Sequence, residues 1–219
     1  MRSVFRFTLW AAILCGIVVG VARATAIRWW RIPTGDPYLE ASIAPTLRGG
    51  DLVILWRLSA PAIGDLVLCP EPTENGADSG RIVIGRMVAE GGDSIAVKQA
   101  RIAVNGSVPE TEGPCRERKF TVSDPETDRE VQQHCSLEAI GSNVHTIGGP
   151  GPEVHQPLDE KPVDVIDGQV WLASDNRMFP YDSRDFGAVD VGACKETVVF
   201  RLVSEAGYFD SEHRFALIR

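Results

Sequence analysis

Lysine is scarce in this 219-residue chain, which carries only four lysines among its 22 basic residues. The lysines are Lys98, Lys119, Lys161 and Lys195. The formal net charge of -8 argues against a nucleic-acid partner. Hydrophobic residues make up 44% and charged residues 24%, which excludes a disordered or collagen-like chain.

Ligands at metal-site spacing are also missing. No pair of cysteines has zinc-finger spacing. The four histidines are scattered over the second half of the chain: His134, His145, His155 and His213. We therefore predict no metal site and no cofactor.

Acidic residues are absent from residues 1–31, which hold five arginines, whereas the rest of the chain holds 17 basic and 30 acidic residues. This asymmetry predicts a membrane-attached head and a soluble body. Residues 7–22 carry no charge and would cover roughly 24 Å as a helix, at about 1.5 Å per residue. A hydrocarbon core measures about 30 Å, but Arg6 and Arg23 could reach its two interfaces. We predict one transmembrane helix within 1–31. The alternative is a cleavable signal peptide ending at the Ala24-Thr25-Ala26 site.

Short apolar runs between turn signals predict an all-β body, and no helical period stands out after the amino-terminal segment. An Asn105-Gly106 pair between β-branched residues indicates a hairpin turn. The expected strands lie at residues 51–56, 65–69, 81–88, 102–108, 169–173 and 196–203.

Residues 109–162 differ from this pattern, because they are polar and lack long apolar runs. They predict an insertion, or cap, in a core formed by 32–108 and 163–219. Cys115 and Cys135 both lie in it, and a disulfide between them would close a loop of about 20 residues. With Cys69 and Cys194 included, three pairings are possible. Cys69 lies in an expected strand, which favours a small core residue.

Three segments, taken in order, carry a family resemblance. They are Ser42-Ile-Ala-Pro-Thr-Leu47, Ile82-Val-Ile-Gly-Arg-Met-Val-Ala-Glu-Gly-Gly-Asp93, and Ser174-Asp-Asn-Arg-Met-Phe-Pro-Tyr-Asp-Ser-Arg-Asp-Phe-Gly187. With the amino-terminal segment and the carboxyl end, they resemble bacterial type I signal peptidase.

The resemblance implies a barrel-like body of antiparallel sheets on a single-pass anchor in the cytoplasmic membrane. The body would face the periplasmic side and remove signal peptides from exported proteins. Its partners would then be membrane lipid and those proteins. Ser42 occupies the position of the nucleophile. A buried polar network near the site would consist of Arg86, Asp175, Asn176, Arg177, Asp182 and Arg184.

The sequence departs from this family at three functional positions. The place of the general-base lysine, directly before Arg86, is Gly85. The serine that orients that lysine falls at Pro180. Glu40 stands where many members have a serine that helps to hold the oxyanion, and a carboxylate there would repel the developing negative charge.

These departures leave three interpretations of function. The chain is a signal peptidase I-like serine endopeptidase, or an inactive pseudopeptidase that binds signal peptides or a secretion partner. In the third interpretation it is an active peptidase whose base is Glu40 or comes from a partner subunit.

Overall fold

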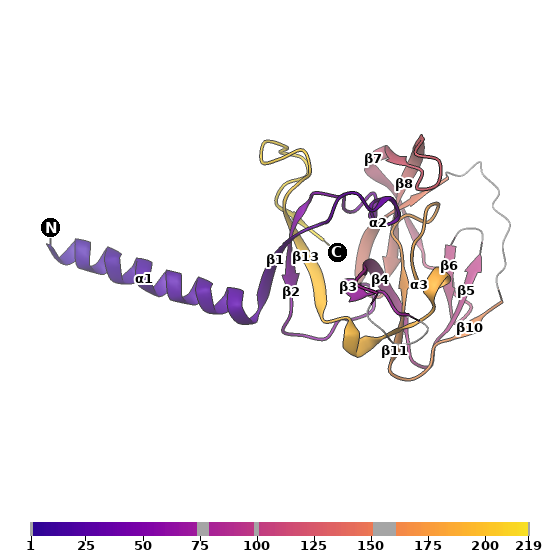
Figure 1. Ribbon diagram of the computed structural model, residues 1–219, viewed down its shortest axis with the longest axis horizontal. Helices are drawn as coiled ribbons and strands as arrows, with labels where there is room; N and C mark the ends of the chain where they lie inside the picture. The colour runs from indigo at the N-terminus through magenta and orange to yellow at the C-terminus, as the bar shows by residue number, and fades with distance from the viewer. Residues whose placement is uncertain (1, 74–78, 99–100, 151–160, 219) are drawn as a thin grey trace.

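The chain forms an amino-terminal helix and a mostly antiparallel β body (Figure 1). The computed structural model describes residues 2–73, 79–98, 101–150 and 161–218. The helices are α1 (Arg2–Thr25), α2 (Pro37–Ile43), α3 (Ser183–Phe186) and a short 3-10 helix, η1 (Val191–Ala193). The strands are β1 (Ile27–Arg31), β2 (Leu52–Trp56), β3 (Leu66–Pro70), β4 (Ile82–Glu90), β5 (Ser94–Lys98), β6 (Arg101–Val104), β7 (Thr111–Ser123), β8 (Glu130–Ile140), β9 (Asn143–Gly149), β10 (Val163–Asp164), β11 (Gln169–Ala173), β12 (Val189–Asp190), β13 (Glu196–Val203) and β14 (Ala216–Leu217).

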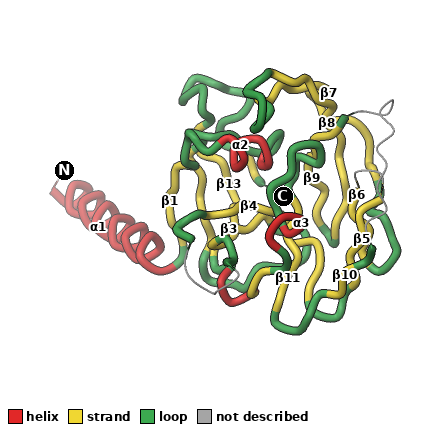
Figure 2. The backbone as a smooth tube through the Cα atoms, turned by 45° about the vertical axis from the view of Figure 1, so that its right-hand side comes forward, coloured by secondary structure: helices red, strands yellow, loops and turns green. Residues whose placement is uncertain are grey.

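The strands form one large sheet and two small ones (Figure 2). The large sheet is curled, has eight strands in the order β1-β2-β13-β3-β4-β11-β12, and carries β14 beside β13. The small sheets have the orders β10-β5-β6 and β7-β8-β9. All of these strand pairs are antiparallel, as expected for the predicted mostly β fold.

Helix α1 projects away from the body and carries exposed apolar side chains such as Phe7 and Trp10 (Figure 1). A helix in this segment was expected, but the described residues include none that is both long enough and apolar enough to cross a membrane. The prediction of a transmembrane helix is therefore not confirmed. Its uncharged stretch, residues 7–22, covers only roughly 24 Å at about 1.5 Å per residue.

Most predicted strands are present, because their apolar runs pack on both faces of the large sheet. Val83 and Ile84 are neighbours on β4, yet they belong to different core clusters. Side chains alternate between the faces of a strand, so a strand buried on both sides has a continuous apolar run. The run at 102–108 is an exception. Only β6 forms there as a strand, and it pairs with β5. The predicted turn is present, because Val104 and Ser107 pair across Asn105-Gly106 in an isolated bridge, and Asn105 has a positive φ of 52°.

The short helices α2 and α3 were not predicted, since four or seven residues are too few to show a helical period. Each begins at an aspartate cap. The Asp36 carboxylate accepts from the N–H groups of Tyr38 and Leu39, and Pro37 occupies the first turn of α2. At α3, Asp182 and Asp185 form a capping box.

Within the polar segment 109–162, residues 111–149 contain the three strands of the β7-β8-β9 sheet (Figure 2). A disulfide joins Cys115 on β7 to Cys135 on β8. A second disulfide joins Cys69 to Cys194, so Cys69 is bonded as well as buried, contrary to the expectation of a free core residue.

Candidate functional site

Ser42 lies in the last turn of α2 and is 1% exposed. Its hydroxyl donates to the Leu39 carbonyl at 2.9 Å, the local bond that a helical serine makes to its own preceding turn. Asn176 holds this end of α2, because its N–H donates to the Ser42 carbonyl and its Nδ2 donates to the Ala41 carbonyl, both at 2.9 Å. The first and third motif segments are thus in direct contact.

Arg86 and Asp175 form a fully buried, two-pronged ion pair between the second and third segments. Arg86 Nε and Nη2 each lie 2.8 Å from an oxygen of the Asp175 carboxylate, and Nη1 donates to the Gly64 carbonyl at 2.7 Å. Burial acts to raise the pKa of Asp175, but the charge and hydrogen bonds of Arg86 outweigh it and hold the pKa below its ordinary value. Asp175 is therefore ionised and serves as an acceptor.

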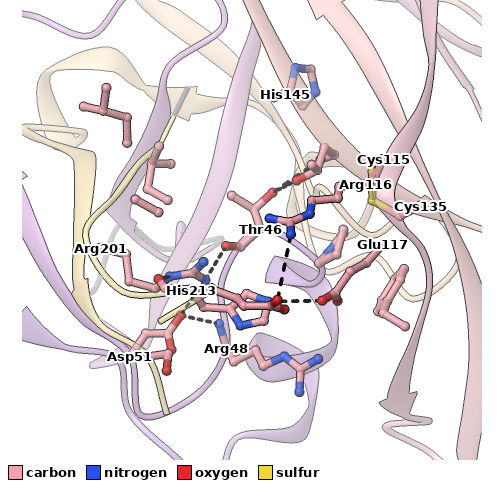
Figure 3. Close-up of a pocket in the computed structure, with 18 of the residues that line it drawn as sticks. Thr46, Arg48, Asp51, Cys115, Arg116, Glu117, Cys135, His145, Arg201 and His213 are labelled. Carbon is pink, nitrogen blue, oxygen red and sulfur yellow. Dashed lines mark hydrogen bonds and ion pairs between the residues drawn. A yellow bond between two sulfur atoms is a disulfide. The ribbon is translucent and has the colours of Figure 1, made fainter. Parts of the chain in front are cut away.

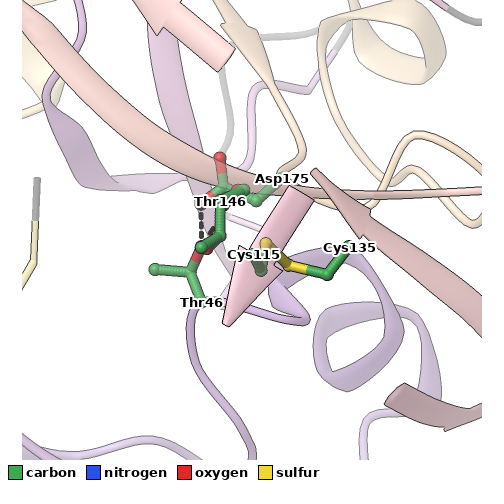
Figure 4. Close-up of a disulfide and its surroundings, with 5 residues drawn as sticks. All are labelled: Thr46, Cys115, Cys135, Thr146 and Asp175. Carbon is green, nitrogen blue, oxygen red and sulfur yellow. Dashed lines mark hydrogen bonds between the residues drawn. A yellow bond between two sulfur atoms is a disulfide. The ribbon is translucent and has the colours of Figure 1, made fainter. Parts of the chain in front are cut away.

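Thr46, four residues after Ser42, joins the same network. Its Oγ1 donates to Asp175 Oδ2 at 2.6 Å and lies 2.7 Å from the Thr146 hydroxyl (Figure 4). The disulfide between Cys115 and Cys135 lies beside this contact (Figure 4). Its sulfur-bearing residues pack on Ala44, so the sheet β7-β8-β9 supports the loop that follows Ser42.

Arg177 extends the network toward two residues that the sequence did not single out. Its Nη2 lies 2.5 Å from Glu138 Oε2, and His145 Nε2 lies 3.4 Å from the same oxygen. Burial lowers the pKa of His145, and the nearby Arg86 and Arg177 lower it further. Glu138 and His145 face each other across β8 and β9, a pairing that only the strand register brings about.

Asp182 and Arg184 form a local pair at α3. The guanidinium of Arg184 contacts both carboxylate oxygens, at 2.8 and 2.6 Å, and the Ser174 N–H donates to Asp182 Oδ2 at 2.6 Å. Burial acts to raise the pKa of Asp182, but these contacts hold it below its ordinary value. The pair fixes the turn that follows the Asp-Asn-Arg motif.

Gly85 lies buried on β4, between Ile84 and Arg86. A Cβ at this position would lie 3.0 Å from Leu172 Cβ, in the cluster that contains Val83 and Met87. Ile84 belongs to the opposite cluster, which contains Leu39 and Ile43 of α2. A side chain at position 85 would therefore start on the face of the sheet opposite to the one on which α2 packs.

Glu40 is also directed away from Ser42. Its Oε1 accepts from the Gly35 N–H at 2.6 Å, and its side chain lies against Gly49. Residues two apart on a helix do not face each other, so α2 separates the Glu40 carboxylate from the Ser42 hydroxyl.

The arrangement is a hydroxyl without a base. Among the described residues, no titratable side chain makes a hydrogen bond to Ser42 Oγ, and a general base must come within that reach. Five residues of the predicted network take part in ion pairs: Arg86, Asp175, Arg177, Asp182 and Arg184. The sixth, Asn176, donates a hydrogen bond to α2.

The site is thus a buried motif serine on α2, held by Asn176 and surrounded by the buried ion pairs of a mostly antiparallel β body. Residues 4–203 match the family described as signal peptidase, peptidase S26, and the chain belongs to this family. No curated protein matches the chain.

Proposed function

We propose that this chain binds the signal peptides of exported proteins and does not cleave them, because it lacks a Ser/Lys pair. One observation carries the proposal: the Ser42 hydroxyl is buried and bonded to the Leu39 carbonyl, and none of the residues that the structure describes places a base beside it. Gly85 and Pro180 supply neither the proton acceptor nor the hydroxyl that would orient one. Membership of the signal peptidase family supports signal peptides as the bound class.

The same proposal places the chain at a membrane. Helix α1 carries its apolar side chains exposed, and at its base the Arg23 guanidinium lies 5.1 Å from the centre of the Trp29 ring. Aromatic and arginine side chains together are typical of a membrane interface. We infer that α1 attaches the body to the cytoplasmic membrane from the periplasmic side, and that residues 109–162 form a cap on the core.

Two measurements on the purified full chain test the function. The first is turnover of a labelled signal-peptide substrate by wild type and by Ser42→Ala. The second is binding of the same peptide, made uncleavable, to both proteins. Binding by both proteins and turnover by neither is the expected result. Absence of binding in detergent or lipid would refute the proposal.

The competing function is an active peptidase, which the retained serine in the Ser-Ile-Ala-Pro-Thr-Leu segment favours. Turnover that is lost in Ser42→Ala would establish this function. It would require the Ser42 side chain to change its rotamer, since its hydroxyl must leave the Leu39 carbonyl to reach a base.

A further inference from the structure

A second site lies outside the one around Ser42. A cavity of about 520 Å³ opens between the β7-β8-β9 sheet and the carboxyl-terminal residues (Figure 3). Its volume is in the range of ligand and peptide sites. Thr46 and the Cys115–Cys135 disulfide line it, whereas Ser42 and Gly85 do not. We call this cavity, between β9 and β14, the β9–β14 groove.

Two edge strands border the groove. Within the described residues β9 pairs only with β8 along its length, apart from an isolated bridge at Gly148. The Gly148 N–H and the Thr146 carbonyl both bond away from β8, to Asp175 and to Thr46. Backbone groups alternate in direction along a strand, so those of Val144 also point away from β8.

The second edge belongs to β14. The Ile218 N–H donates to the Val199 carbonyl of β13 at 3.0 Å, so the backbone groups of its neighbour Leu217 point away from β13. Leu217 and Val144 both line the groove. Unpaired strand edges are the places where an extended peptide adds to a sheet.

The interior of the groove has an apolar wall, beside the buried Arg201–Asp51 pair, and its rim is charged. Phe120, Leu137 and Ile218 line it together with the disulfide. Two long contacts cross between its walls: the ion pair of Arg116 with Glu212 and the contact of His213 with Glu117, both at 3.9 Å (Figure 3). All four of these rim side chains are well exposed, so they can exchange partners with a bound chain.

The charges lining the groove are not balanced. It has five carboxylates but three arginines, and each arginine already faces a carboxylate: Arg48–Glu205, Arg201–Asp51 and Arg116–Glu212. The two remaining carboxylates, Glu117 and Asp210, share His213. A hydrogen bond from Ser204 helps to lower the pKa of Asp210 to about 2, so its charge is present at neutral pH.

We propose that the β9–β14 groove binds an extended polypeptide segment with basic side chains. The edges of β9 and β14 supply main-chain hydrogen bonds, the apolar wall receives alternate side chains, and the surplus carboxylates receive lysine or arginine. This inference does not depend on the proposed signal-peptide function, because Ser42 does not line the groove, although Thr46, His145 and Thr146 belong both to the groove wall and to the polar network beside Ser42.

Fluorescence anisotropy with a labelled peptide of alternating valine and lysine tests the proposal on the full chain. The comparison peptide has glutamate in place of lysine. The basic peptide is expected to bind at least roughly tenfold more tightly, and the difference to shrink at high salt. N-methylation of every second amide should abolish binding in one register and spare it in the other, because only one set of amides faces the sheet edge.

Two substitutions assign the binding to this groove. Glu117→Gln should weaken binding of the basic peptide severalfold. The control is Glu130→Gln, which changes an exposed glutamate of the same sheet outside the groove and should leave binding unchanged. An apolar signal peptide should not displace the basic one. Equal affinity for both peptides, equal effects of both N-methylated registers, or an unchanged affinity in Glu117→Gln would each overturn the proposal. Self-association of the chain that blocks the groove without peptide binding would do so too.

Discussion

Asp175→Asn removes one charge from the buried ion pair with Arg86 and leaves the shape of the side chain nearly unchanged. The guanidinium keeps a single acceptor of full strength, the Gly64 carbonyl, and has no exposure to water. Breaking a buried pair in this way costs about 3–5 kcal/mol, because the remaining charge is uncompensated. For a chain of this size, that lowers the melting temperature by on the order of 6–20 °C.

Thermal unfolding followed by circular dichroism measures the effect. Ser42→Ala is the matched control in the same site, since it removes one hydrogen bond to the Leu39 carbonyl and should cost about 0.5–1.5 kcal/mol. The cycle with Arg86→Met isolates the pair: the double variant should lose less stability than the two single losses added together. Additive losses, or a melting temperature of Asp175→Asn equal to that of Ser42→Ala, would refute the reasoning.

Three further outcomes follow from the structure. Burial lowers the pKa of His145, so the unfolded chain takes up its proton first and stability falls as the pH drops through about 6.5. Between neutral pH and pH ~5, the melting temperature of His145→Gln should therefore fall less than that of wild type or of the partly exposed control His134→Gln. Replacing Cys115 and Cys135 by serine should cost roughly 3 kcal/mol, measured by denaturant unfolding, and labelling of these thiols in the untreated protein would contradict the bond. Gly85→Lys should gain no Ser42-dependent turnover of a signal-peptide substrate and should melt lower than Gly85→Ala: both variants place a Cβ against Leu172 Cβ, but only the lysine brings an ammonium into an apolar cluster; restored turnover would show that α2 and β4 can rearrange.

The strands could be predicted from the sequence because their signal is local. An apolar run such as 82–84 becomes a strand buried on both faces, and the turn residues around it fix its ends. Helix α2 has a local signal as well, the Asp36-Pro37 pair, which is a typical helix start. The helix was still not predicted, because so short an element shows no helical period.

Much of the candidate site could not be predicted, because it depends on register. Glu138 and His145 have no motif around them, and they meet Arg177 only through the pairing of β8 with β9 and the contact of Gly148 with the Asp175 segment. The direction of Glu40 was also missed. Proximity in sequence to Ser42 suggested proximity in space, but the helical turn places the carboxylate at Gly35 instead.

Losing a buried ion pair destabilises the fold, whereas a glycine at position 85 does not. Removing Asp175 strands a buried guanidinium, and removing Asp182 leaves the buried N–H group of Ser174 without its acceptor. A glycine at position 85 has no comparable cost in stability, because it leaves no unpaired charge and Leu172 fills the space beside it. In this chain the ion pairs are complete although position 85 holds a glycine, because each pair stabilises the fold whichever residue stands there. For this reason the Asp-Asn-Arg and Asp-Ser-Arg residues identify the fold, whereas the activity has to be judged from Ser42 and its own hydrogen bond.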